Sequence, residues 1–451
     1  MTTRSCLSIV LAAGLGTRMK SNLPKVMHEV GGLPLVGHVI KALSAAGSER
    51  ISVVTGPDMP ALEQLVFKMA PMARCYVQTE RLGTAHAVLA AKPALEFEAD
   101  DVLVLFGDTP LVSAGTVSRV RKALENGADL AVLGFETRRP HGYGRLLIEN
   151  GRLKAIREEK DASDEERRIT YCNSGIMGFS GKHALGLLEA IGNDNAKGEY
   201  YLTDAVEIAN RNGLKVVAVK GTEIETQGIN TRAQLASCEA DFQALQRRGA
   251  LENGCTLLAP STVYFSHDTD LSVDVTVEQN VVFGPGVQVA KGARIRAFSH
   301  LEGAQVGEGS VVGPYARLRP GTVLGTDTKV GNFVEVKNAT FGAGAKANHL
   351  SYIGDASVGS KSNIGAGTIT CNYDGYLKHR TEIGAGSFVG SNSTLVAPVK
   401  LGNASFVAAG SVITEDVLKD SMAFGRARQT VKEGKAKQLR ARLQSAKDAK
   451  S

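Results

Sequence analysis

Short apolar runs alternate with helical segments in the first half of the chain. Residues 8–11, 51–54 and 102–106 form mainly apolar runs of strand length, and each run leads into a glycine-containing turn. Such runs are typical of strands buried on both faces of a parallel sheet. Residues 35–46 and 84–91 have helical patterning. The alternation predicts an α/β sheet wound with helices on both faces, with ligands at the carboxyl ends of its strands.

A single amphipathic helix is expected to link this half to the next. Between residues 231 and 248, Leu235, Cys238, Phe242 and Leu245 fall at helical spacing, and Gly249 is a plausible stop. We therefore divide the chain into a first domain at 1–230, a linker helix at 231–252 and a second domain at 253–451.

The second half repeats with a period of six. Helices need a period near 3.6 and a simple hairpin sheet a period of two, so neither explains this pattern. Six fits a solenoid in which each hexad forms one flat side of a triangular coil. The inward positions are Leu271, Val277, Phe283, Val289, Ile295, Leu301, Val306, Val312, Leu318, Leu324, Val330, Val336, Phe341, Ala347, Ile353, Val358, Ile364, Ile383, Val389, Leu395, Leu401 and Val407.

One interruption breaks this repeat. Between Ile364 and Ile383 the period fails, in a stretch that contains Asn-Tyr-Asp-Gly at 372–375. Insertions in a repeat array usually form loops on a binding face. We expect a loop to leave the solenoid here.

Charge and composition exclude several classes of protein. The net charge is +6, but residues 426–451 hold nine Lys/Arg and two Asp/Glu, a local +7, so the rest of the chain is at −1. The basic character therefore belongs to a tail, which is either a phosphate-binding segment or a solvated end, and does not indicate a nucleic-acid-binding protein. Trp is absent, which leaves few platforms for stacking bases.

The cysteines and the hydropathy pattern indicate a cytoplasmic protein. The six cysteines show no C-x-x-C spacing, which gives neither a disulfide framework nor a zinc site. No apolar stretch reaches the roughly 18 residues that a membrane span needs, and the first apolar run lacks a cleavage site and continues into a glycine loop. We expect no membrane insertion.

The loop after the first strand suits a nucleotide's phosphates. It reads L-A-A-G-L-G-T-R-M at 11–19, followed by Pro24 and Lys25. Met19 replaces the third glycine of a dinucleotide fingerprint, and a Walker A Gly-Lys-Ser/Thr is absent. Backbone N–H groups with Arg18 and Lys25 as cations remain, which is suitable for phosphate. The full string resembles the signature of the sugar-1-phosphate nucleotidyltransferases.

Further motifs extend this resemblance over nearly the whole chain. They include Gln78 with G-T-A-H-A at 83–87, F-G-D at 106–108, Y-G-R at 143–145, N-S-G at 173–175 and G-I-N at 228–230. With the hexads, which resemble the left-handed parallel β-helix of the hexapeptide acyltransferases, the chain resembles the bifunctional bacterial family of UDP-N-acetylglucosamine synthesis. This implies a Rossmann-like domain followed by the β-helix, and a role in supplying peptidoglycan and lipopolysaccharide synthesis.

The resemblance implies two reactions, acetylation of glucosamine-1-phosphate by acetyl-CoA and transfer of UMP from UTP to N-acetylglucosamine-1-phosphate. The implied Mg²⁺ ligands are Asp108 and Asn230. Gln78, Gly83 and Thr84 would lie on the uracil, and Gly144, Glu158 and Asn173 on the sugar. The full set implied for the nucleotide sugar is Leu11, Ala12, Ala13, Gly14, Lys25, Gln78, Gly83, Thr84, Phe106, Gly107, Asp108, Gly144, Glu158, Asn173 and Asn230.

For acetyl transfer the resemblance implies His349 as the general base, because the amine must lose a proton before it attacks. Glu335 is expected to orient its imidazole, while His86 and His28 are expected to be structural. The implied glucosamine-1-phosphate ligands are Arg319, Lys337, Tyr352 and Asn363, and the implied acetyl-CoA ligands are Ala366, Asn372, Tyr373, Ser391, Ala409 and Arg426. In the family such sites form between subunits, so a homotrimer is expected.

Two other interpretations stay open at this point. One is a nucleotidyltransferase whose β-helix only assembles or regulates, and it predicts no acetyl-CoA chemistry. The other is a non-enzymatic scaffold built from the same modules, and it predicts a degraded phosphate loop. The intact loop at 14–25 argues against the scaffold, and His349 with the loop at 372–373 argues against the silent β-helix.

Overall fold

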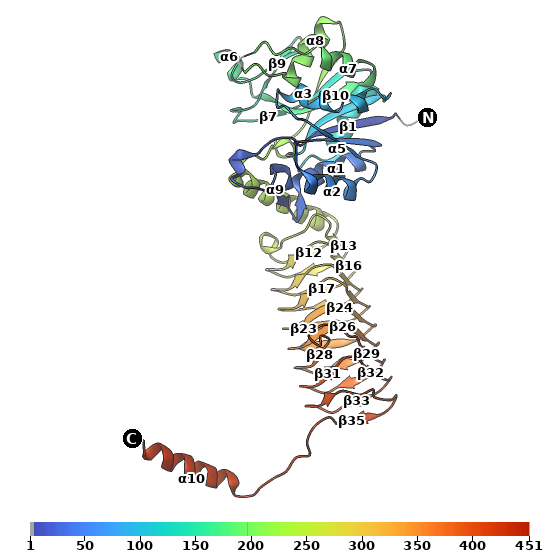
Figure 1. Ribbon diagram of the computed structural model, residues 1–451, viewed down its shortest axis with the longest axis vertical. Coiled ribbons are helices and arrows are strands. Elements are labelled where there is room, and N and C mark those ends of the chain that lie inside the picture. The colour runs from blue at the N-terminus through green and yellow to red at the C-terminus, as the bar shows by residue number, and fades with distance from the viewer. Residues whose placement is uncertain (1–3, 196, 451) are drawn as a thin grey trace. The chain divides into compact units, whose positions relative to one another are not determined.

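The computed structural model describes residues 4–195 and 197–450, which divide into two compact units. The first comprises residues 4–248 with 265–267, and the second 249–264 with 268–450. Each unit is described by itself, and Figure 1 labels their elements.

The first unit is built on a nine-stranded mixed sheet. Along its main path the strand order is β11-β7-β10-β6-β1-β4-β5, in which β10 is antiparallel to both neighbours. The strands are β1 (Cys6–Leu11), β4 (Arg50–Thr55), β5 (Arg74–Val77), β6 (Asp101–Phe106), β7 (Leu130–Glu136), β8 (Arg145–Glu149), β9 (Arg152–Arg157), β10 (Tyr171–Ser180) and β11 (Val216–Lys220), beside a small pair, β2 (Glu29–Val30) and β3 (Leu33–Pro34).

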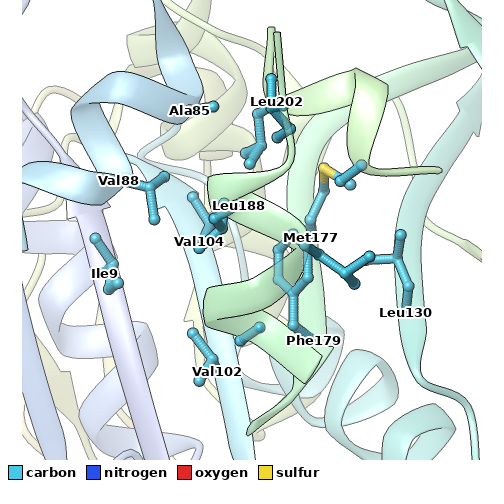
Figure 2. Packing of buried hydrophobic residues seen from close by; sticks show 14 of the residues in the cluster. Ile9, Ala85, Val88, Val102, Val104, Leu130, Met177, Phe179, Leu188 and Leu202 are labelled. Carbon is cyan, nitrogen blue, oxygen red and sulfur yellow. The ribbon is translucent and has the colours of Figure 1, made fainter. Parts of the chain in front are cut away.

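Helices cover both faces of this sheet, as the alternating pattern predicts. Buried side chains of α3, α7 and α8 pack on one face, and those of α1, α2 and α5 on the other. Figure 2 shows the core on the face covered by α3, α7 and α8, where Phe179 and Met177 of β10 lie beside Leu188. The helices are α1 (Leu35–Ala45), α2 (Pro60–Met69), α3 (Thr84–Ala90), α4 (Lys92–Leu95), α5 (Ala114–Glu125), α6 (Asp164–Arg167), α7 (Gly181–Glu189) and α8 (Ala205–Arg211), with short 3-10 turns at Thr17–Met19, Lys25–Met27, Leu202–Asp204 and Ile224–Thr226.

The linker helix predicted at 231–252 is present, but it continues through Gly249. Helix α9 spans Arg232–Glu252, so the expectation that Gly249 ends it is wrong. The helix stops instead before Gly254, whose φ of 87° lies in the left-handed region that glycine adopts without a Cβ clash. Cys238 and Phe242 are buried as expected, but Leu245 is 41% exposed.

The second unit is a parallel β-helix, whose stacked coils are visible in Figure 1. One ladder consists of β12 (Thr256–Leu257), β14 (Thr276–Val277), β17 (Arg294–Ile295), β20 (Val311–Val312), β23 (Lys329–Asn332), β25 (Lys346–His349), β27 (Asn363–Ile364), β30 (Phe388–Val389), β33 (Phe406–Val407) and β35 (Met422–Ala423). The other strands are β13 (Asp270–Leu271), β15 (Val282–Phe283), β16 (Gln288–Val289), β18 (His300–Leu301), β19 (Ala304–Val306), β21 (Arg317–Leu318), β22 (Thr322–Leu324), β24 (Glu335–Phe341), β26 (Tyr352–Val358), β28 (Ile369–Cys371), β29 (Thr381–Ile383), β31 (Thr394–Val396), β32 (Val399–Leu401) and β34 (Val412–Ile413).

The hexad positions form the core of this β-helix. All of the predicted inward residues are buried except Leu271, which is intermediate. The loop that leaves the β-helix is shorter than the predicted interruption between Ile364 and Ile383. Thr370 of β28, six residues after Ile364, still points into the core and is 1% exposed. Its hydroxyl accepts from the Gly354 N–H at 2.8 Å and donates to the Gly354 carbonyl at 3.0 Å, so a polar residue is satisfied there. Within residues 364–383, the chain leaves the coil between β28 and β29.

The basic tail ends in helix α10 (Lys435–Asp448), all of whose residues are exposed.

Candidate active sites

Leu11 at the carboxyl end of β1, Phe106 at that of β6 and Gln78 just after β5 border a pocket of about 430 Å³ in the first unit. This is the edge where an open α/β sheet binds ligands. Among the residues predicted for the nucleotide sugar, it is lined by Leu11, Ala12, Ala13, Gly14, Lys25, Gln78, Gly83, Thr84, Phe106, Asp108 and Asn230. Gly107 adjoins the wall, since its N–H donates to the Leu11 carbonyl at 2.9 Å.

The glycine loop is fixed by backbone geometry. Gly16 has a φ of 63°, and a Cβ there would lie 2.5 Å from the Cβ of Lys25. Only glycine allows this close approach, which brings Lys25 back over the loop. The Ala12 N–H donates to the Val54 carbonyl at 2.8 Å, which attaches the start of the loop to β4.

Lys25 joins the two residues predicted to bind metal. Its ammonium donates to Oδ2 of Asp108 in a short ion pair and to Oδ1 of Asn230 at 3.0 Å. Arg18 also donates to Oδ1 of Asn230, at 2.9 Å. Residues more than two hundred positions apart thus converge at one corner of the pocket. Two hard oxygen donors that face one cation are the donor set that Mg²⁺ prefers.

Gln78 lies buried at another part of the pocket wall. Its amide Nε2 is 3.3 Å from Nδ1 of His86 and 3.4 Å from the Gly83 carbonyl. His86, expected to be purely structural, therefore contacts the side chain predicted to read the base. Gly83 has a φ of 122°, and a Cβ there would lie 2.5 Å from the Tyr200 carbonyl oxygen. The segment 78–84 is consequently held tightly against the pocket.

The three residues predicted for the sugar form their own cluster. The Asn173 N–H donates to the Gly144 carbonyl at 2.8 Å, and a Cβ on Gly144 would lie 3.5 Å from Oε1 of Glu158. Burial raises the pKa of Glu158, opposed mainly by the charge of Lys197. Phe106 packs its ring against Gly175, where a Cβ would lie 2.5 Å from the ring.

Sequence reasoning missed one polar residue of this pocket, Arg81, whereas Glu199, which also lines it, belongs to the motif E-Y-Y-L-T-D at 199–204 that supports the resemblance. Arg81 stands three residues after Gln78, and its position between two recognised motifs is the signal that could have drawn attention to it.

In the second unit, the predicted base and most of the predicted acetyl-CoA ligands share one corner of the β-helix. His349 pairs with Asn332 on the preceding coil. On the next coil Ile364 pairs with Ala347, and Ala366 follows Ile364 by two residues just as His349 follows Ala347, so His349 and Ala366 occupy equivalent positions. The Asn392 N–H then donates to the Ala366 carbonyl at 2.7 Å. This corner is exposed at His349.

The same column continues to the end of the coils. The Gly410 N–H donates to the Ser391 carbonyl at 2.8 Å, which places Ala409 one coil after Ser391. A Cβ on Gly410 would lie 3.9 Å from Cδ of Arg426. His349, Ala366, Ser391, Ala409 and Arg426 therefore form one column, which we call the corner column.

Two cations, Arg319 and Lys337, lie on the flat side that follows this corner, and we call them the cationic cluster. Glu335 pairs with Tyr352, and Lys337 with Gly354, in the register of β24 and β26. The Tyr352 phenol covers Gly354, where a Cβ would lie 2.5 Å from its oxygen. Asn363 is on the ladder of β25, paired with Lys346 on the side before the corner.

The predicted role of Glu335 is wrong in this structure. Glu335 accepts from Arg319 at 2.7 Å, while Nδ1 of His349 is 2.8 Å from Oδ1 of Asn332. The carboxylate binds the nearer guanidinium because a charged pair gains more than a carboxylate–imidazole contact. Asn332 is the residue that orients His349, and Lys378 is a further member of the cationic cluster that sequence reasoning missed. The adjacent ammonium of Lys337 lowers the pKa of Lys378.

Asn372 and Tyr373 lie at a different corner from the corner column. The Asn372 amide donates to Asp355, which also accepts from Asn338 at 2.6 Å. Burial would raise the pKa of Asp355, but these two hydrogen bonds hold it below its usual value. Tyr373 is 61% exposed on the loop.

Exposed aromatic rings stack beside the corner column. Phe298, Tyr315 and Phe333 follow one another on successive coils, with ring centroids 4.9 Å and 5.2 Å apart. Leu350, which follows His349 in the sequence, occupies the equivalent position on the next coil. All four have positive φ values and large exposed surfaces. We call these four residues the aromatic corner.

Within residues 4–195 and 197–450, no cluster of three or more His, Cys, Asp and Glu side chains is placed to hold a metal ion. In the same part of the chain, no helix has the length and apolar character needed to cross a membrane.

The fold and the two sites define a transferase that combines a nucleotidyltransferase with a hexapeptide-repeat domain. The family model for a MobA-like NTP transferase domain matches residues 8–172, and that for the bacterial transferase hexapeptide (six repeats) matches residues 303–338. Relatives named bifunctional protein GlmU match at 57% identity in Azorhizobium caulinodans, 55% in Agrobacterium fabrum and 54% in Bartonella quintana, with 98%, 99% and 98% of both chains covered.

The chain belongs to the GlmU family. This confirms the expected function, in which a bifunctional enzyme acetylates glucosamine-1-phosphate with acetyl-CoA and transfers UMP from UTP to N-acetylglucosamine-1-phosphate. It also favours this function over a β-helix that only assembles or regulates.

Proposed function

We propose that the pocket of the first unit is the uridyltransferase site, and that the corner column with the adjoining cationic cluster is the acetyltransferase site. The observation that carries the first assignment is the convergence of Lys25, Asp108 and Asn230 in a pocket that Gln78 also lines. The second rests on the alignment of His349 with Ala366, Ser391 and Ala409 on successive coils.

In uridyl transfer, a phosphate oxygen of N-acetylglucosamine-1-phosphate attacks the α-phosphorus of UTP. The bond from that phosphorus to the bridging oxygen breaks, and pyrophosphate leaves. The protein's task is positioning and charge neutralisation, so no protein nucleophile is needed. Lys25 neutralises phosphate charge, the glycine loop donates N–H groups, and Gly144, Glu158 and Asn173 hold the sugar.

Asp108 and Asn230 would hold Mg²⁺, because their oxygens already face a common cation, the Lys25 ammonium. The bound ion would neutralise charge on the phosphates. Asp108 is therefore essential to metal binding, because its carboxylate supplies a negatively charged oxygen ligand for a divalent ion. Gly144 and Phe106 have no such side-chain ligand.

In acetyl transfer, the amine of glucosamine-1-phosphate attacks the thioester carbonyl, the carbon–sulfur bond breaks, and the thiol of CoA leaves. Oδ1 of Asn332 accepts a hydrogen bond from the Nδ1–H of His349, which keeps the proton on Nδ1 and leaves Nε2 with a free lone pair. Nε2 can then take the ammonium proton and pass it to the departing sulfur. Arg319, Lys337, Tyr352 and Lys378 supply charge and hydrogen bonds for the sugar phosphate.

A second copy of the chain completes the acetyltransferase site in this proposal. Asn372 and Tyr373 lie at a different corner from the corner column, and His349 is open to solvent. The aromatic corner offers a stacked apolar strip beside His349, which a neighbouring copy in a homotrimer would cover. We place the protein in the cytoplasm, where UTP and acetyl-CoA are available, and keep 1–230, 231–252 and 253–451 as functional boundaries.

A coupled assay tests both assignments on the full-length chain. With glucosamine-1-phosphate, acetyl-CoA, UTP and Mg²⁺, we expect thiol release and pyrophosphate release, and omission of acetyl-CoA should stop both. Addition of N-acetylglucosamine-1-phosphate should then restore pyrophosphate release alone. Pyrophosphate release from unacetylated glucosamine-1-phosphate at the same rate would contradict the order of reactions.

A further inference from the structure

Arg81 lies where the segment 78–84 meets the glycine loop. Its Nε donates to the Ala13 carbonyl at 3.1 Å, and the residue lines the nucleotide pocket together with Gln78 and Gly83. Gly56, just after β4, leaves room for the guanidinium, since a Cβ there would lie 3.3 Å from Nη2 of Arg81 and 3.4 Å from the Ala13 oxygen. The guanidinium is thus positioned by backbone on two sides.

Arg81 forms no ion pair among the residues that the structure describes, although Glu199 also lines the pocket. Lys25 and Arg18 are engaged with Asp108 and Asn230. In the described part of the chain, no carboxylate oxygen lies within 4.0 Å of a guanidinium nitrogen of Arg81. Its hydrogen bond goes to a neutral backbone carbonyl, that of Ala13. With Nε committed to Ala13, the terminal N–H groups remain as donors for a ligand.

Gln78 cannot by itself distinguish uracil from cytosine. An amide can turn its oxygen or its nitrogen toward a base, so it can pair with the N–H and carbonyl of uracil or with the acceptor and amine of cytosine. Its neighbour His86, 3.3 Å away, can donate or accept at Nδ1 according to tautomer and can follow either orientation. A guanidinium has five N–H donors and no acceptor, so it admits only acceptors on the base.

We propose that Arg81 determines the preference for uridine by donating a hydrogen bond to the C4 carbonyl of uracil, the position at which cytosine carries an amine. This inference rests on the proposed uridyltransferase site. A cytosine amine at the same place is itself an N–H donor, so it cannot accept a hydrogen bond from the guanidinium. The guanidinium would then remain without a partner in the occupied pocket. Sites built around such a hydrogen bond reject ligands that cannot make it much more strongly than apolar pockets reject a missing methylene.

The test compares UTP and CTP as substrates with N-acetylglucosamine-1-phosphate in full-length Arg81→Gln. A hydrogen bond that involves a charged group contributes about 1.5–3 kcal/mol, so kcat/KM for UTP should fall by about 10- to 100-fold. The value for CTP should stay level or rise, so the UTP/CTP ratio should fall by a similar factor. Arg81→Lys should recover part of the ratio, and Arg74→Gln, on β5 and outside this pocket, is the matched control.

Equal losses for UTP and CTP would overturn the proposal, because they would make Arg81 a phosphate contact or a clamp for the glycine loop. An unchanged ratio would overturn it too. Acetyl transfer by the same preparation reports whether the variant is folded, and Gly56→Ala, which crowds the guanidinium without changing its chemistry, should lower the ratio in the same direction. Wild-type protein that turns over neither nucleotide would instead refute the proposed uridyltransferase site.

Discussion

The two candidate sites are built in opposite ways. In the first unit, the strand ends, the glycine loop and the segment 78–84 enclose a pocket within a single chain. In the second unit, the corner column and the cationic cluster lie on the outside of a β-helix whose interior is filled by the hexad residues. A filled solenoid has no internal cavity for a ligand, so it presents its chemistry on edges that a neighbour must cover.

The largest effect is expected for Asp108→Ala. Removal of the carboxylate takes away the negative oxygen donor that contacts Lys25 beside Asn230, which should reduce pyrophosphate release by at least about 10³-fold. Thiol release should stay within about twofold, because the β-helix holds none of these residues. Equal losses in both assays would show that the two sites are not separate.

His349→Ala should lower acetyl transfer by about 10²- to 10⁴-fold, the range for loss of a general base. The dissociation constant for acetyl-CoA should change little, and the defect should shrink as rising pH frees the substrate amine. Asn332→Ala removes the hydrogen bond to Nδ1 and should reproduce a smaller part of the defect. Wild-type acetyl transfer by His349→Ala at pH 7 would make His349 a structural residue.

Truncation after Gly425 should have a smaller effect. If Arg426, at the end of the corner column, binds a phosphate of acetyl-CoA, its loss should raise KM for acetyl-CoA by about 10- to 100-fold. Uridyl transfer should be unchanged, and sedimentation should still report the same oligomer. Arg426→Gln in the full-length chain separates the side chain from the rest of the tail; a normal KM in this variant would exclude Arg426.

The smallest effect concerns the stability of the first unit. Burial lowers the pKa of His38 to about 4, although its Nε2 lies 2.8 Å from the Val30 carbonyl. An imidazole whose folded pKa lies below its unfolded value of about 6.5 favours the folded state above pH 6.5, and this stability is lost as pH falls toward 4. The free energy of unfolding should drop by up to about 3 kcal/mol over that window. His38→Gln should flatten the pH dependence in chemical denaturation; an unchanged slope would contradict the assignment.

Periodicity predicted most of the fold because the strongest signals came from buried positions. The hexads locate nearly every inward residue of the β-helix, and the apolar runs locate β1, β4 and β6. Thr370 was invisible to an apolar period because hydrogen bonds to Gly354 satisfy its hydroxyl in the core. Gly249 does not stop α9, because it has room in the helix, whereas Gly254 has the left-handed φ that follows the helix end at Glu252.

The sites were less predictable than the fold because side-chain partners depend on distances that sequence does not contain. The motifs identified Lys25, Asp108 and Asn230, but their common contact appears only in three dimensions. Glu335 was assigned to His349 by proximity in the repeat, yet Arg319 is its nearer partner. Lys378 and Arg81 escaped because neither stands in a recognised motif.

The most direct test of the contrast is to measure both activities on one preparation of Phe298→Asp/Tyr315→Asp. The two positions lie in the aromatic corner two or three coils before His349, and aspartate tolerates the positive φ of each. Sedimentation should show monomers that keep uridyl transfer within about twofold of wild type. Acetyl transfer should fall at least tenfold and recover in part at high protein concentration. Monomers with full acetyl transfer would contradict the account, because the second site would then be complete in one chain.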